Sequence, residues 1–122
     1  MTKPRLLIID DEKDLCELLA EVVENHFQVQ CLTDHTDISS FFLKNSFDLI
    51  LTDLCMPGLK VDEIISIARQ SQKPAPVILF TGSSDQDPKV QKCLNLGASG
   101  YISKPIKDIS ALNQTLLSFL KK

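Results

Sequence analysis

Short apolar runs alternate with amphipathic segments along this chain of 122 residues. Residues 5–9, 47–53 and 77–80 contain continuous apolar runs, which are typical of strands buried on both faces of a sheet. Residues 27–31 instead alternate between apolar side chains and glutamines, a period of two that indicates a strand at a sheet edge. Residues 100–103 form a further short strand. The pattern therefore predicts five strands.

Helical spacing of apolar side chains predicts a helix after each strand. The first helix extends from about residue 13 to residue 25. Asp87 and Pro88 suit the start of the fourth helix, and Gly97 suits its C-cap. Asp108 suits the N-cap of the fifth helix. The apolar positions expected to face inward are Leu15, Leu18, Leu19, Val22 and Val23; Ile38, Phe41 and Phe42; Val61, Ile64, Ile65 and Ala68; Val90, Cys93 and Leu94; and Ile109, Leu112, Leu116, Phe119 and Leu120.

The alternation of five strands with five helices predicts an α/β fold with a parallel sheet, helices on both faces and right-handed crossovers. With 43% hydrophobic and 24% charged residues, the chain fits one globular domain over residues 1–122. All strands of a parallel sheet end at the same edge. Ligands of open α/β sheets bind at that carboxyl edge, near the point where the strand order reverses.

Charge and cysteine content exclude several classes of function. The net charge is −3 and the 13 basic residues are scattered, so the sequence does not suggest a nucleic-acid surface. No apolar segment approaches membrane-spanning length, and the acidic residues 10–12 end the first apolar run too early for a signal peptide. Wide spacing favours free thiols in a reducing cytoplasm for the four cysteines, Cys16, Cys31, Cys55 and Cys93.

Chemically capable side chains stand at the ends of four strands. Asp10 and Asp11 follow the first strand, and Asp53 ends the third. Thr81 follows the fourth strand, and Lys104 follows the fifth. Each residue alone has an ordinary explanation as a cap, a turn residue or a solvated lysine. Because parallel strands end at one edge, however, all five should meet there, and their combination favours a functional site.

Such a set of side chains suits phosphoryl chemistry. Carboxylates held close together repel each other unless they are neutralised. Mg²⁺ relieves this repulsion, since it typically takes one or two carboxylates and keeps waters for an incoming phosphate. A lysine supplies a charge for a phosphoryl oxygen, and a threonine supplies a hydroxyl donor. Beside these groups an aspartate can act as a nucleophile and form an aspartyl phosphate. We therefore expect Mg²⁺ as the cofactor.

The motifs resemble the receiver domain of two-component response regulators over essentially the whole chain. The resemblance rests on residues 6–12 (LLIIDDE), residues 53–57 (DLCMP), Thr81-Gly82 and Lys104-Pro105, in that order and at similar spacing. It implies a flavodoxin-like, doubly wound parallel sheet of order 2-1-3-4-5 with five helices on both faces. The chain departs from the family pattern at residues 58–61 (GLKV), where a small acidic residue or Asn followed by Gly is usual. The partner contacts of that loop are therefore open.

The resemblance also implies a role for each candidate residue. These are Asp53 as the phosphoacceptor, Asp10 and Asp11 with Asp53 and the backbone carbonyl of Cys55 as Mg²⁺ ligands, Thr81 and Lys104 as phosphoryl contacts, and Thr81 with Tyr101 as the switch. The implied phosphodonor is a sensor histidine kinase or a histidine phosphotransfer protein. The implied output is an effector reached through the fourth helix, fifth strand and fifth helix, together with a phosphorylation-dependent dimer.

Under this reading the domain catalyses its own phosphorylation and dephosphorylation and is not a turnover enzyme. It binds neither nucleic acid nor membrane directly. We expect the Lys104-Pro105 peptide bond to be cis. The Cys55 thiol is a weak hydrogen-bond partner, so we expect it to position the hydrolytic water poorly and thereby to influence the lifetime of the phosphorylated form.

Three other functions are compatible with the fold. A flavodoxin-like module that binds flavin shares the topology, but the acidic first loop offers no Gly-rich or Ser/Thr-rich phosphate cradle. A metal-dependent phosphatase would use Asp53 as a transient nucleophile and would turn over a phosphomonoester. A receiver-like scaffold that works without phosphate is disfavoured because all five site residues are present.

Overall fold

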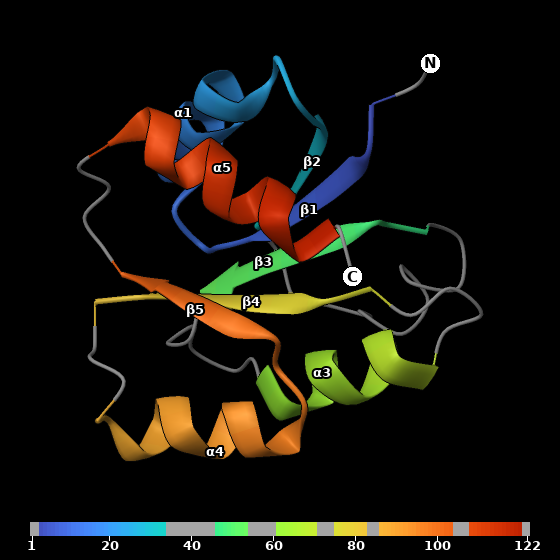
Figure 1. The fold of residues 1–122 in the computed structure, drawn as a ribbon, viewed down its shortest axis with the longest axis vertical. Helices are drawn as coiled ribbons and strands as arrows, with labels where there is room; N and C mark the ends of the chain where they lie inside the picture. Colours follow the sequence, from blue (N-terminus) through green and yellow to red (C-terminus); the bar gives the residue numbers. More distant parts are fainter. Residues whose placement is uncertain are drawn as a thin grey trace.

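The computed structural model describes residues 3–33, 46–53, 61–70, 75–82, 86–103 and 108–120. Element labels follow Figure 1. The elements are β1 (Arg5–Ile9), α1 (Lys13–Val23), β2 (Gln28–Leu32), β3 (Leu49–Asp53), α3 (Val61–Gln70), β4 (Val77–Thr81), α4 (Pro88–Leu96), β5 (Gly100–Ser103) and α5 (Ile109–Leu120). The helix expected around Ile38, Phe41 and Phe42 lies outside the described residues.

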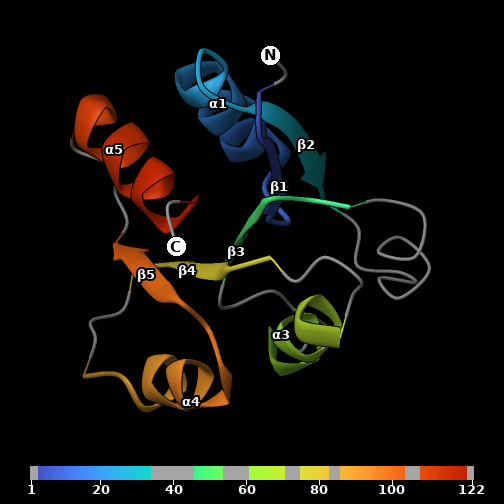
Figure 2. The same cartoon turned by 45° about the vertical axis from the view of Figure 1, so that its right-hand side comes forward.

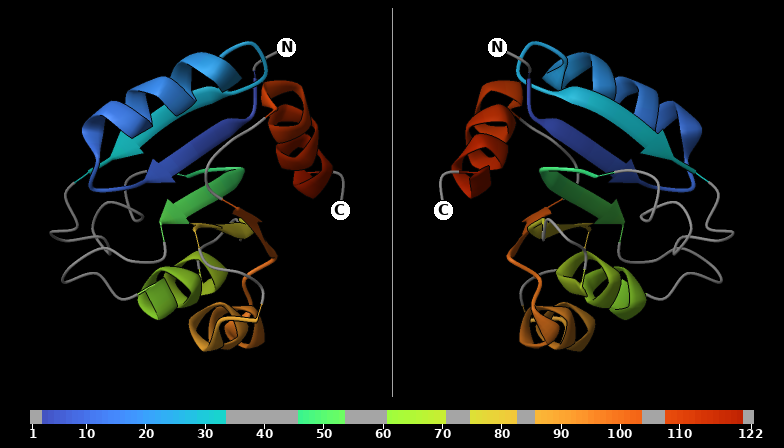
Figure 3. Two further views of the ribbon diagram at one scale, coloured as in Figure 1. Left: turned by 90° about the vertical axis from the view of Figure 1, so that its left-hand side faces the viewer. Right: turned by 90° about the vertical axis from the view of Figure 1, so that its right-hand side faces the viewer.

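The five strands form one parallel sheet in the order β2-β1-β3-β4-β5, which confirms the predicted fold class. Figures 1, 2 and 3 show α1 and α5 on one side of this sheet and α3 and α4 on the other. All residues of β3 and β4 are buried, whereas β2, with its glutamines exposed, lies at an edge. The continuous and alternating patterns thus correctly separated central from edge positions.

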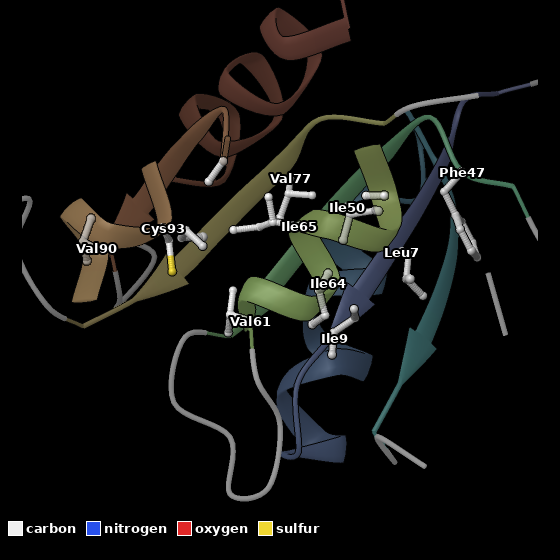
Figure 4. Packing of buried hydrophobic residues seen from close by; sticks show 13 residues of the cluster. Leu7, Ile9, Phe47, Ile50, Val61, Ile64, Ile65, Val77, Val90 and Cys93 are labelled. Carbon is white, nitrogen blue, oxygen red and sulfur yellow. The ribbon is translucent and has the colours of Figure 1, made fainter. Parts of the chain in front are cut away.

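Alternate strand residues fill two apolar cores, one under each helical layer. The core on the α3/α4 side includes Leu7, Ile9, Ile50, Val77 and Leu79 from the strands. In Figure 4, Ile64, Ile65 and Cys93 reach toward these strand residues from the helices. The core on the α1/α5 side takes the intervening strand positions and contains Leu6, Ile8, Cys16, Leu19, Val23, Phe27, Leu49, Leu51, Ile78, Phe80, Leu112 and Leu116.

The prediction that all the apolar helix positions face inward is wrong for two residues. Leu18 is 56% exposed and Ile109 is 52% exposed. The buried residues of α1 are Cys16, Leu19 and Val23, and Leu18 stands about 100° around the helix from Leu19. Ile109 is the first residue of α5, which starts beyond the end of β5. Cys16, which was not among the expected inward positions, lies in the core.

The predicted helix caps are present. Asp87 Oδ1 accepts a hydrogen bond from the Lys89 amide at 2.8 Å, and Asp108 Oδ1 accepts one from the Ala111 amide at 3.2 Å. Gly97 ends α4 with a φ of 122°, a conformation that favours glycine. These caps fix where α4 and α5 begin and where α4 ends. Among the helices described, none has the length and apolar character needed to cross a membrane.

Candidate functional site

The strand register brings the candidate residues to one edge. Ile9 of β1 is aligned with Thr52 of β3, so the following residues, Asp10 and Asp53, leave the sheet at the same level on adjacent strands. Asp53 is itself aligned with Phe80 of β4, and Thr81 follows directly. The register of the strands is thus sufficient to make Asp10, Asp53 and Thr81 neighbours.

Asp10, Asp11 and Asp53 form an acidic cluster. Each offers a carboxylate oxygen, and these three oxygens lie within 4.8 Å of one another. Asp10 is 1% exposed and Asp53 is 9% exposed, whereas Asp11 is exposed to solvent. Like charges at this separation repel, and burial of two of them removes water that would screen the repulsion. The cluster has the oxygen chemistry and the concentrated negative charge that a divalent cation requires.

Asp10 is held by hydrogen bonds on its backbone and its side chain. Its amide donates to the Leu32 carbonyl at 3.2 Å, and its Oδ1 accepts from the Glu12 amide at 2.9 Å. Its carbonyl oxygen accepts from the thiol of Cys16 at 3.7 Å. These contacts come from β2, from the β1–α1 turn and from α1. Asp10 is therefore fixed before any ligand arrives.

The ordinary explanation for Asp11, that it caps α1, does not hold. Glu12 occupies the N-cap position and makes no side-chain capping hydrogen bond. Asp11 precedes it, is exposed, and contributes a carboxylate oxygen to the cluster. The three carboxylates together match the hard-oxygen preference of Mg²⁺, which commonly keeps part of its water shell for a phosphate ligand. The residues present therefore fit such an ion.

Thr81 and Tyr101 lie on adjacent strands beside this cluster. Thr81 ends β4, is 3% exposed and is aligned with Ser103, the last residue of β5. Tyr101 is aligned with Leu79, two residues before Thr81, and packs against the core on the α3/α4 side. Both proposed switch residues thus lie along the β4–β5 pair. Lys104, the Lys104-Pro105 peptide and Cys55 lie outside the part of the chain that is described.

The buried thiol of Cys16, which lies next to the cluster, was not predicted from the sequence. Burial, followed by the neighbouring Cys31 and Asp10, raises the pKa of the Cys16 thiol to about 12. Burial also raises the pKa of Cys31, in part offset by a hydrogen bond with Cys16. The two cysteines lie 15 positions apart in the sequence (31 − 16), on a helix and an edge strand, and no motif joins them. Only the packing of α1 on β2 gives them a place in the same apolar core.

The chain thus combines a flavodoxin-like parallel sheet of order 2-1-3-4-5 with an acidic cluster at its carboxyl edge that could hold a metal ion. The model of the response regulator receiver domain matches residues 6–116. This chain therefore belongs to the response regulator receiver domain family.

Curated relatives and solved structures agree with this assignment. The chain is 34% identical over 119 residues to the response regulator ArlR of Staphylococcus aureus, covering 97% of this chain and 53% of ArlR. It is 30% identical to the transcriptional regulatory protein TctD of Salmonella typhimurium, covering 97% and 52% of the two chains. This chain thus spans about half the length of these curated relatives.

Among solved structures, full-length FixJ of B. japonicum aligns with a TM-score of 0.85 at 25% identity, covering 99% of this chain and 59% of FixJ. The chemotaxis protein CheY4 of Vibrio cholerae aligns with a TM-score of 0.84 at 24% identity, covering 98% and 100% of the two chains. The second likeness shows the fold alone.

Proposed function

We propose that this chain accepts a phosphoryl group on Asp53 from a phosphorylated histidine and acts as a conformational switch. The donor is a sensor histidine kinase or a histidine phosphotransfer protein. One observation carries the proposal: Asp53 ends a fully buried central strand, with a carboxylate oxygen within 4.8 Å of those of Asp10 and Asp11. Membership of the receiver family supports it.

Asp10, Asp11 and Asp53, with the backbone carbonyl of Cys55, would hold the Mg²⁺ ion. When bound, the ion neutralises carboxylate charge and orients phosphoryl oxygens. Asp10 contributes by presenting its carboxylate in a fixed place, held by the Leu32 carbonyl and the Glu12 amide, and Asp11 adds a carboxylate from the solvent side. Such preorganisation lowers the cost of charge rearrangement during transfer.

In the transfer step an Asp53 carboxylate oxygen attacks phosphorus. A P–O bond forms and the P–N bond to the donor histidine breaks, leaving its electron pair on the imidazole nitrogen. The hydroxyl of Thr81 and the ammonium group of Lys104 stabilise the phosphoryl oxygens. Burial of Asp53 and Thr81 limits the access of bulk water. Hydrolysis later returns Asp53 to a carboxylate, so the domain completes a cycle on itself and is not a turnover enzyme.

The signal leaves through α4, β5 and α5. Thr81 precedes α4, and Tyr101 lies on β5 within contact of the α3/α4-side core. A phosphoryl group that draws Thr81 toward Asp53 would change the space available to Tyr101. An effector domain or protein reads this surface, and a phosphorylation-dependent dimer would form there. The domain itself, residues 1–122, makes no direct contact with nucleic acid or membrane.

The chain works in the cytoplasm. Free thiols at Cys16, Cys31 and Cys93 support a reducing compartment. Sensor kinases or phosphotransfer proteins present phosphohistidine to their partners there.

The test is phosphorylation by a small acyl phosphate, followed by the intact mass of the protein. We expect one phosphoryl group per chain with Mg²⁺ and none with a chelator in excess. Asp62 is an exposed residue of α3, and the variant Asp62→Asn serves as a control that should be phosphorylated like the parent. Steady release of phosphate from a phosphomonoester would identify a phosphatase instead. If no phosphoryl group is found even with Mg²⁺, the protein is instead a receiver-like scaffold that works without phosphate.

A further inference from the structure

A groove lies between α3 and α4, which are neighbours on one side of the sheet (Figure 2). It is lined from α3 by Val61 and Asp62, and from α4 by Lys89, Lys92, Cys93 and Leu96. The α4 residues recur at intervals of three and four positions, so they form one face of that helix. None of the six belongs to the proposed phosphorylation site.

The floor of the groove is apolar. Val61 and Cys93 are buried and belong to the core on the α3/α4 side, and Figure 4 shows them on the two neighbouring helices. Leu96 extends this apolar surface outward and is 40% exposed. A ligand that covers the Leu96 side chain would therefore gain free energy by removing apolar surface from water.

The rim of the groove is cationic. Lys89 and Lys92 are both exposed, and within the described part of the chain neither ammonium group takes part in an ion pair or a hydrogen bond. Lys89 is the second residue of α4, where the helix dipole disfavours a cation, and the first turn holds no acidic residue. Asp62 adds one negative charge from α3. The groove thus has a net positive charge, although the net charge of the chain is −3.

We propose that this groove binds a small organic monocarboxylate with an apolar body, such as a medium-chain fatty acid. The carboxylate accepts from the ammonium groups of Lys89 and Lys92, and the hydrocarbon part covers Leu96 and the apolar floor. The hollow measures about 420 Å³, within the range of about 300–1,000 Å³ for small-molecule sites. Its six lining residues are too few for a stable protein partner, which contacts about 20–30 residues on each side.

The charges of the groove favour a single negative charge on the ligand. A phosphate ester carries nearly two charges at neutral pH, and the carboxylate of Asp62 would repel the second. An inorganic anion would leave the apolar floor uncovered. An apolar cation would meet both lysines. A monocarboxylate with a hydrocarbon body satisfies the rim and the floor together.

The test is a titration of the full, metal-free chain with octanoate, followed by amide NMR. We expect saturable shifts in residues 61–62 and 89–96. Butyrate, which has the same carboxylate and a shorter apolar body, should bind at least about tenfold more weakly. Shifts spread over α1 and α5, or an equal response to octylammonium, would overturn the proposal. Shifts of the groove signals on concentrating the protein alone would identify a second copy as the occupant and would overturn it as well.

Variants at exposed positions test the two parts of the groove without disturbing the core. The double variant Lys89→Gln/Lys92→Gln should bind octanoate about threefold to thirtyfold more weakly, because two partly exposed ion pairs are lost. Leu96→Ala should weaken binding by about threefold or more through loss of apolar contact. Lys13→Gln, at an exposed position of α1, should bind like the parent. A double variant with the affinity of the parent would contradict the role of the lysines.

A ligand in this groove would also act on α4. It contacts α3 and α4 together, and α4 follows β4, the strand that ends at Thr81. This consequence rests on the proposed function: if phosphorylation shifts α4, it must change the affinity for octanoate, and octanoate must change the affinity for a phosphoryl analogue by the same factor. We expect that factor to be about fivefold or more.

Octanoate titrations with and without the phosphoryl analogue and Mg²⁺ measure this factor. Equal affinities in a protein that binds both ligands would overturn the coupling. If the protein binds no phosphoryl analogue, the proposed function fails, while the metal-free titration and the lysine variants still decide whether the groove is a carboxylate site.

Discussion

Asp10 and Asp53 each place a carboxylate oxygen within 4.8 Å of the other, although they end different strands of the sheet. The alignment of Ile9 with Thr52 is enough to produce this proximity. Asp11 adds a third negative charge at the same place. The folded chain thus keeps a repulsive arrangement that a stability criterion alone would not select, which is typical of functional sites.

Removing one of these charges should stabilise the folded protein and at the same time weaken the binding of Mg²⁺. Asp11→Asn should raise the Tm of the metal-free protein by about 2–4 °C, since it relieves repulsion at an exposed position. The same variant should lower the affinity for Mg²⁺ by at least about tenfold. Thermal unfolding with and without Mg²⁺ checks both. Asp14→Asn, another exposed acidic residue nearby, should leave the Mg²⁺ response unchanged. Equal responses of the two variants would contradict the metal site.

The β4–β5 pair should carry the signal. Amide NMR signals from residues 86–103 should shift when a phosphoryl analogue binds the parent protein with Mg²⁺. Thr81→Ala should lose most of these shifts, because the hydroxyl that reaches the phosphoryl group is gone. Thr115→Ala, at an exposed site on α5, is the matched control. Shifts confined to residues 10–12 and 53 in the parent would argue against Tyr101 as a switch residue.

Gly97 should be essential to the end of α4. Its φ is 122°, and a Cβ placed there would lie 2.6 Å from Arg69 Nη1. Arg69 Nη1 also donates to the Leu96 carbonyl at 3.0 Å, a hydrogen bond that is lost if the Arg69 side chain moves aside. Gly97→Ala should lower the free energy of unfolding by about 1–2 kcal/mol. Chemical denaturation measures this. Gly82→Ala, where a Cβ meets nothing within 4 Å, should be nearly neutral.

Stability at high pH should depend on Cys16. Burial raises the pKa of this thiol from 9.0 to about 12. Above pH 9 the unfolded chain loses the thiol proton while the folded chain keeps it. The thiol's contribution to the free energy of unfolding is therefore complete below pH 9 and is lost as the pH rises toward 12. Over this range the free energy of unfolding falls by up to about 1.4 kcal/mol per pH unit.

Denaturation across this range, with a reductant present, should show a shallower slope for Cys16→Ala than for the parent. Val23→Ala, at another buried position of α1, should lower stability by an amount that does not change with pH. A slope in Cys16→Ala as steep as that of the parent would count against the assignment.

Most of the fold could be predicted from the sequence because the patterns that indicate each strand and helix are local. Continuous apolar runs marked β1, β3 and β4, and a period of two marked β2 as an edge strand. Asp10, Asp53 and Thr81 were predictable as neighbours because parallel strands end at one edge. The burial of Cys16 was not predictable, since it depends on how far α1 is rotated on the sheet. The same rotation explains why Leu18 is exposed.

The central claim is that Asp53 carries the phosphoryl group, and chemical mapping of the adduct tests it most directly. The protein is treated with an acyl phosphate and Mg²⁺, reduced with borohydride to convert an aspartyl phosphate into homoserine, and digested for mass spectrometry. We predict homoserine at position 53 alone, none after chelation of Mg²⁺, and none in Asp53→Asn. Homoserine at another aspartate of the parent, or labelling of Asp53→Asn equal to that of the parent, would contradict the account.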